Sequence, residues 1–83
     1  MVITHFDFQR MTLPEQGEAV WTKGTFFGER REKGIWIQCY SLGSFYVEVY
    51  YDNKDNRLVK FESFTQASYL APYMLLAINQ GNQ

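Results

Sequence analysis

The feature that most constrains this chain is the stretch from Ile35 to Asp52, IWIQCYSLGSFYVEVYYD. Two runs rich in aromatic and β-branched residues flank Gly43-Ser44, and a two-residue loop with Gly in first place is typical of a type II′ β-hairpin. The loop fixes the register, because Leu42 then lies opposite Phe45. The pairs expected to follow on that face are Tyr40 with Val47, Gln38 with Val49, and Trp36 with Tyr51.

The two faces of this hairpin differ in polarity. We assign the drier face to the core and expect the other face to be partly wet, because it mixes Glu48 and Ser41 with two tyrosines. The expected core residues are Trp36, Tyr40, Leu42, Phe45, Val47, Val49 and Tyr51.

Helical signals precede the hairpin. Residues 12–15, Thr-Leu-Pro-Glu, match a capping box with Pro in the first turn, and they predict a helix over 13–23 that ends before Gly24. Its expected apolar stripe is Leu13, Gly17, Val20 and Trp21. Residues 1–11 predict an irregular lead-in, or a single turn opened by Thr4 and Asp7, that places one Phe on the core.

Two further strands are predicted beside the hairpin. In the first, over 25–31, Gly28 indicates a bulge. A two-residue loop at Lys33-Gly34 would place Phe27 opposite Tyr40, and a three-residue loop would place Phe26 there. In the last, over 57–63, a five-residue loop would pair Val49 with Val59, Val47 with Phe61, and Glu48 with Lys60.

The segment after residue 64 is predicted to be helical but divided by Pro72. A proline is tolerated only in the first turn of a helix, and it disfavours helical angles at the residue before it, Ala71. We therefore expect a short turn near 65 and a second helix that begins at Pro72, with Leu75, Leu76 and Ile78 as its stripe. The predicted fold is one α+β domain over 1–83. It has a four-stranded antiparallel meander over 25–63, flanked by the N-terminal helix 13–23 and the Pro-broken helix 65–79, in two layers.

Composition restricts the function. Eight basic and nine acidic residues give a net charge of −1, so no strong field attracts nucleic acid or an anionic membrane. No apolar run approaches the roughly 20 residues of a membrane span, and the N-terminus lacks a signal-peptide pattern, so we expect a cytoplasmic protein.

Three strings of this sequence, GTFFGER, LGSFYVEVYYD and SFTQASYLAPYM, carry a resemblance. Together they are similar to a set of small uncharacterised bacterial proteins of about this length, which share a G-T-F strand, an F-Y-V-E-V hairpin and a closing L-x-P-Y segment. The resemblance covers most of residues 12–76. It implies a free-standing cytoplasmic domain and carries no activity with it.

Catalytic and metal-binding groups are few. His5 is the single imidazole and Cys39 the single thiol, so neither a Cys–His zinc site nor a triad is indicated, and we expect no metal and no cofactor. A carboxylate pair of Glu29 and Glu48 across strands could support a hydrolase. We favour solvated strand charges and a non-enzymatic protein.

The half-apolar face with the two tyrosines is the candidate functional surface. If both helices cover the opposite face, this face is open, as interaction surfaces are. If the N-terminal helix covers it and the C-terminal helix covers the other, the sheet is fully buried. The expected surface for homodimerisation or docking of a protein partner comprises Ile37, Cys39, Tyr46, Glu48, Tyr50, Leu58 and Lys60.

The alternative is binding of RNA or of a single-stranded nucleic acid. The tyrosines would stack on bases, and the neighbouring basic residues would contact phosphates. Those basic residues are Arg30, Arg31 and Lys33. The near-neutral net charge and the acidic residues on the face favour a protein partner.

Overall fold

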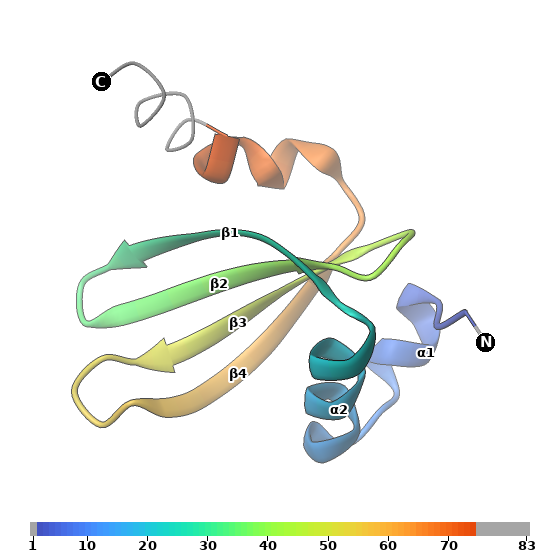
Figure 1. Ribbon diagram of the computed structural model, residues 1–83, viewed down its shortest axis with the longest axis horizontal. Helices are drawn as coiled ribbons and strands as arrows, with labels where there is room; N and C mark the ends of the chain where they lie inside the picture. The colour runs from blue at the N-terminus through green and yellow to red at the C-terminus, as the bar shows by residue number, and fades with distance from the viewer. Residues whose placement is uncertain (1, 75–83) are drawn as a thin grey trace.

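The computed structural model describes residues 2–74 and contains four antiparallel strands in one open sheet, in the order β1-β2-β3-β4 (Figure 1). The α+β fold class and the meander are thereby confirmed. The strands are β1 (Thr25–Glu32), β2 (Ile35–Ser41), β3 (Tyr46–Asp52) and β4 (Arg57–Phe64), and the helical segments are α1 (His5–Gln9), α2 (Leu13–Lys23) and the 3-10 helix η1 (Ala67–Leu70).

The central hairpin of β2 and β3 has the predicted register. The Leu42 N–H donates to the Phe45 carbonyl at 2.9 Å, and Gly43 adopts a φ of 94°, which only glycine adopts without strain. The expected pairs are all present: Tyr40 with Val47, Gln38 with Val49, and Trp36 with Tyr51.

A bulge in β1 resolves the two registers that the sequence left open. The loop to β2 has two residues, since Glu32 pairs with Ile35, yet Phe26 lies opposite Tyr40, because the register shifts between Phe26 and Gly28. A Cβ at Gly28 would lie 3.3 Å from atoms of the Tyr73 side chain. The small residue predicted to mark a bulge therefore also permits a close contact with the C-terminal segment.

The predicted register between β3 and β4 is wrong by two residues. Asp52 pairs with Arg57 across a four-residue turn that ends at Asn56, whose φ is 54°. The shorter turn accounts for one residue of the difference. A bulge accounts for the other, because it leaves Val59 without a partner, and beyond it Val49 pairs with Phe61 rather than with Val59. The remaining pairs are Tyr50 with Lys60, Glu48 with Glu62, and Val47 with Ser63.

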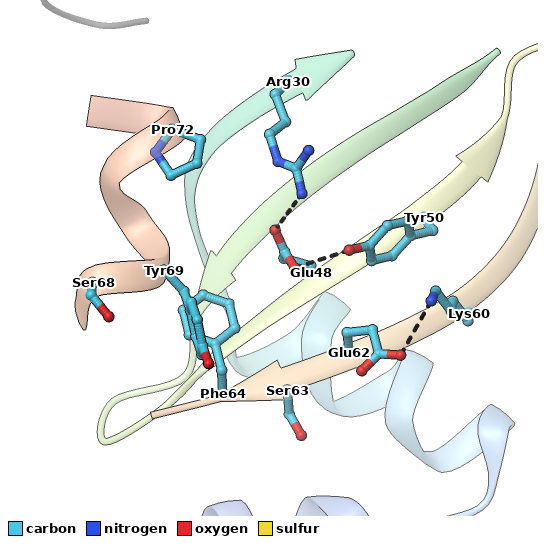
Figure 2. A pocket seen from close by; sticks show the side chains of 10 residues that line it. All are labelled: Arg30, Glu48, Tyr50, Lys60, Glu62, Ser63, Phe64, Ser68, Tyr69 and Pro72. Atoms are coloured by element: carbon cyan, nitrogen blue, oxygen red, sulfur yellow. Dashed lines mark hydrogen bonds and ion pairs between the residues drawn. The ribbon is translucent and has the colours of Figure 1, made fainter. Parts of the chain in front are cut away.

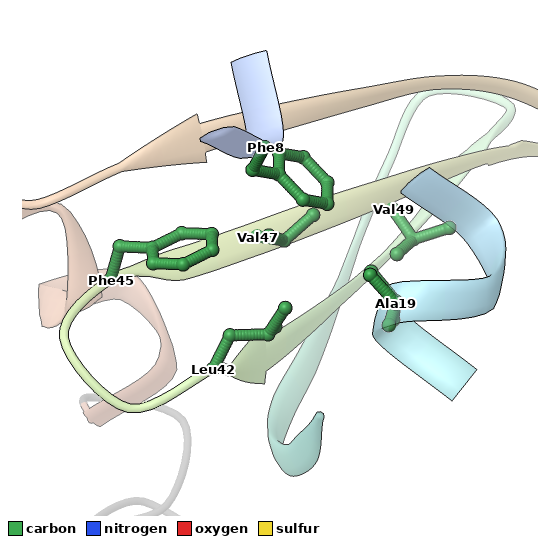
Figure 3. Packing of buried hydrophobic residues seen from close by; sticks show 7 residues of the cluster. Phe8, Ala19, Leu42, Phe45, Val47 and Val49 are labelled. Atoms are coloured by element: carbon green, nitrogen blue, oxygen red, sulfur yellow. The ribbon is translucent and has the colours of Figure 1, made fainter. Parts of the chain in front are cut away.

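Helices α1 and α2 cover one face of the sheet, which we call the helix face and define by Val47, Val49 and Tyr51. Both helices begin at a Thr in a capping box, Thr4 for α1 and Thr12 for α2. The predicted helix over 13–23 is confirmed, and the lead-in contains a helical turn. The main core lies beneath these helices, and its buried members are Phe8, Ala19, Val20, Leu42, Phe45, Val47 and Val49 (Figure 3).

The expected stripe of α2 is only partly correct. Gly17 and Val20 are buried with Ala19, whereas Leu13 and Trp21 are each 51% exposed. Gly24 ends α2 in an extended conformation, and a Cβ there would lie 2.6 Å from the Val20 carbonyl oxygen.

The C-terminal segment packs on the opposite face, which we call the Tyr50 face and define by Cys39, Tyr46, Glu48 and Tyr50 (Figure 1). Leu70 and Tyr73 join Cys39 and Phe64 in a second buried cluster. The helical segments thus cover both faces of the sheet. The alternative in which the N-terminal helix covers the face with the two tyrosines is wrong in one respect, because α2 lies on the helix face and the C-terminal segment lies on the Tyr50 face.

The backbone before Pro72 differs from expectation. Ala71 has helical angles (φ −52°, ψ −44°). The helix that was expected to begin at Pro72 therefore already includes Ala71, and it follows η1 directly. Pro72 therefore lies within the first turn, where its missing N–H leaves no hydrogen bond unmade. The predicted stripe of Leu75, Leu76 and Ile78 lies outside the described residues.

Candidate interaction surfaces

The centre of the Tyr50 face is a carboxylate held by three donors. Glu48 accepts hydrogen bonds from the Tyr73 hydroxyl at 2.6 Å, from the Tyr50 hydroxyl at 3.1 Å and from the Arg30 guanidinium at 3.2 Å (Figure 2 shows the last two). Its side chain is only 13% exposed. Charge-assisted bonds of this kind offset the cost of burying the carboxylate, so Glu48 joins β1, β3 and the C-terminal segment.

The surroundings of Glu48 keep both tyrosine hydroxyls protonated. Burial, together with the negative charge of Glu48, raises the pKa of Tyr50 to about 12. Burial and the hydrogen bond to Glu48 also raise the pKa of Tyr73 well above its ordinary value. Both hydroxyls therefore remain hydrogen-bond donors throughout the physiological pH range.

A groove of about 430 Å³ opens beside this network, between the outer strand β4 and η1 (Figure 2). On one side the Lys60 ammonium lies 4.7 Å from the centre of the Tyr50 ring and 3.3 Å from a Glu62 oxygen. On the other side the rings of Phe64 and Tyr69 meet edge to face at 5.5 Å. The lining residues are Arg30, Glu48, Tyr50, Lys60, Glu62, Ser63, Phe64, Ser68, Tyr69 and Pro72.

The structure changes the membership of the predicted partner surface. Glu48, Tyr50 and Lys60 line the groove, and Tyr46 is half-buried against the Phe64 ring. Ile37 and Cys39 are fully buried, so their prediction as surface residues is wrong. Burial also raises the pKa of the Cys39 thiol to about 12.

Leu58 was predicted on the wrong face. It pairs with Tyr51 and packs against the main core, because the bulge at Val59 reverses the alternation of side chains along β4. Sequence reasoning also missed Tyr69 and Phe64 as groove walls. The expected short turn near residue 65 was the one signal that could have placed them there.

The basic residues of the nucleic-acid alternative do not form one patch. Arg30 is bound to Glu48 and Glu32 on the Tyr50 face. Arg31 lies on the helix face, with its guanidinium 5.0 Å from the Trp36 ring centre. Only Lys33 projects from an exposed turn.

The carboxylate pair considered for hydrolysis is also separated. Glu29 accepts a hydrogen bond from the Trp36 indole on the helix face, whereas Glu48 lies on the opposite face. These two carboxylates cannot flank one scissile bond. The structure does bring His5 Nε2 within 2.9 Å of the Ser63 hydroxyl, a contact between α1 and β4.

A second groove, of about 450 Å³, lies on the helix face between α2 and the outer part of β4. Sequence reasoning did not predict it, because the stripe of α2 was expected to be buried. Its lining is mostly apolar: Leu13, Pro14, Gly17, Glu18, Trp21, Thr22 and Leu58.

These features define the class of protein. It is a small α+β domain with an open four-stranded antiparallel meander and a groove on each face. Between residues 2 and 74, no helix is long and apolar enough to cross a membrane, and no cluster of His, Cys, Asp and Glu could hold a metal ion. No family model matches the chain, and no curated protein or solved structure matches it significantly. The resemblance to small bacterial proteins stays a prediction.

Proposed function

We propose that this chain is a non-enzymatic interaction domain that binds a polypeptide segment of a partner protein in the groove of the Tyr50 face. The observation that carries the proposal is the groove itself, whose volume of about 430 Å³ suits a few side chains of a partner. Its aromatic walls offer large contact areas, and Tyr is enriched at energetically important interface positions.

The charges of the groove favour a polypeptide over a polyanion. Arg30 and Lys60 are balanced by Glu48 and Glu62, and both cations are already paired with carboxylates. A phosphate backbone would have to displace these partners, whereas a peptide offers both donors and acceptors to such a mixed rim.

The edge strands of the sheet also favour binding in the groove over binding along an edge. Each edge strand contains a bulge, at Phe27 in β1 and at Val59 in β4, and each also carries several charged side chains. Bulges and charges on edge strands oppose the addition of another strand. Side-chain docking in the groove is therefore the better supported way of binding.

Tyr69 and Lys60 are the positions for a test, because both are at least half-exposed and can be changed without opening the core. The purified protein, immobilised, is used to capture partners from lysate of its own cells. A Tyr69→Ser and Lys60→Glu double variant should lose the captured protein. The control is Phe6→Ser, which alters a side chain that is 63% exposed on α1 and should retain capture.

Equal capture by the wild type, the double variant and Phe6→Ser would contradict the proposal, and so would the absence of specific capture by any of them. Tyr50→Glu is unsuitable, because it places a second carboxylate beside Glu48 and would destabilise the fold. A parallel titration with single-stranded RNA at low salt tests the alternative, and binding that Lys60→Glu weakens would favour nucleic acid.

A further inference from the structure

We infer that the C-terminal segment over residues 65–74 is a strap that opens and closes over the Tyr50 face as a unit, while the sheet and the helix face stay folded. Within residues 2–74, this segment is the only helical part that lies on the Tyr50 side of the sheet (Figure 1). The inference concerns the free chain, and only its consequence for partner binding rests on the proposed function.

Few side chains hold the strap. Of its ten residues only Leu70 and Tyr73 are buried, and the other eight are exposed. Thr65 and Gln66, which connect the strap to β4, belong to no helix or strand, and the Gln66 side chain does not cap η1. A segment with so few buried apolar contacts opens at a much smaller cost in free energy than the whole domain.

The buried contacts of the strap are separate from the main core. Leu70 and Tyr73 pack with Cys39 and Phe64, and this cluster shares no member with the cluster beneath α1 and α2. The sheet lies between the two clusters. When the strap opens, the hydrogen bonds between strands and the packing of the helix face therefore stay in place.

One polar link fastens the strap to the sheet. The Tyr73 hydroxyl donates to Glu48 at 2.6 Å, and Arg30, which also binds Glu48, places its guanidinium 5.7 Å from the centre of the Tyr73 ring. In the open form Glu48 keeps its bonds to Tyr50 and Arg30 and gains contact with water. No buried carboxylate is left without a partner, so this link does not prevent opening.

Cys39 records the position of the strap. Its side chain is fully buried with Leu70 and Tyr73, and its pair on β1 is Gly28, which has no side chain to cover the thiol. In the closed form an alkylating reagent cannot reach the thiol, and burial raises its pKa to about 12. In the open form the thiol is exposed and ionises as an ordinary cysteine. The rate of alkylation therefore measures the fraction of open strap.

The strap also forms one wall of the proposed binding groove. Ser68, Tyr69 and Pro72 line the groove together with Lys60 and Glu62 of β4, so the groove exists only in the closed form. A partner in the groove holds the strap closed, because a ligand stabilises the state that it binds. Opening of the strap thus sets the fraction of the chain that is competent to bind.

The test is the rate at which iodoacetamide alkylates Cys39 at pH 8 in the full chain without a partner. Tyr73→Phe removes the bond to Glu48 and should raise the rate by about 10- to 150-fold, the effect of losing one hydrogen bond to a charged group. The matched control is Val20→Ala, which removes buried volume beneath α2. It weakens the domain without loosening the strap, so the rate should change by less than about twofold.

Urea separates local opening from complete unfolding. Up to about 1 M urea the wild-type rate should rise by less than about twofold, because opening of the strap exposes little surface, whereas alkylation through complete unfolding would rise at least about 5-fold. If Tyr73→Phe does not fold, as judged by circular dichroism, Leu70→Ala takes its place and should also raise the rate.

Three results would overturn the inference: equal increases with the strap variant and Val20→Ala, no increase with the strap variant, or a urea dependence equal to that of complete unfolding. A failure of partner capture leaves all of these rates unchanged. The inference and the proposed function can therefore fail separately.

Discussion

Removing one hydroxyl group tests whether Glu48 holds the C-terminal segment against the sheet. Tyr73 is 4% exposed, and its hydroxyl donates to Glu48 at 2.6 Å. In Tyr73→Phe the ring keeps its packing beside Gly28, so the variant isolates the hydrogen bond. A hydrogen bond to a charged group contributes about 1.5–3 kcal/mol, and Glu48 would keep its bonds to Tyr50 and Arg30.

The expected result is a loss of about 1.5–3 kcal/mol in the free energy of unfolding, measured by urea titration with two probes. For a domain of this size each kcal/mol lowers Tm by about 4–8 °C. The control is Tyr69→Phe, whose ring is 56% exposed and whose hydroxyl water can solvate, so its stability should change by less than about 0.5 kcal/mol. Equal effects of the two variants would refute the claim that Tyr73 is anchored by Glu48.

Three further results are expected from the core. Phe8→Ala should cost about 3–5 kcal/mol in urea titration, because the ring is 1% exposed and contacts the aromatic cluster beneath α1. Gly24→Ala should cost about 1–3 kcal/mol, because its Cβ would lie 2.6 Å from the Val20 carbonyl oxygen, and an unchanged stability would contradict that close approach. Cys39 should resist alkylation at pH 8 in the folded protein. Burial raises the pKa of Cys39 from about 9 to about 12, so the stability that the thiol contributes is complete below pH 9 and is lost as the pH rises towards 12. Urea titrations of Cys39→Ala should therefore show a smaller loss of stability between pH 9 and pH 12 than those of the wild type.

Much of the fold could be predicted because its signals are local. The Gly43-Ser44 loop sets the register of the central hairpin without reference to the rest of the chain. The same holds for α2, whose capping box and following glycine lie within thirteen residues, and for the bulge that Gly28 indicated in β1. Each of these elements needs only its own neighbours to be recognised.

The site was harder to predict because its contacts are distant in sequence. Tyr73 reaches Glu48 across 25 residues, and it does so from a segment whose geometry depends on how Pro72 is accommodated. Nothing in the alternation of β3 distinguishes a Glu48 on a wet face from a Glu48 saturated by three donors. The burial of Cys39 likewise depends on its packing against Leu70 and Tyr73, which are distant in sequence and cannot be read from the alternation along β2.

The bulge at Val59 explains why one predicted surface became two. Without it, Leu58 and Lys60 would share a face, and the apolar and charged residues of β4 would form a single patch. With it, Leu58 contributes to the floor beside α2, while Lys60 remains with Tyr50 on the opposite face. A partner in the groove of the Tyr50 face therefore leaves the groove beside α2 free. Trp21→Arg should leave partner capture unchanged, because Trp21 lines the groove of the helix face, whereas the Tyr69→Ser and Lys60→Glu double variant should abolish capture.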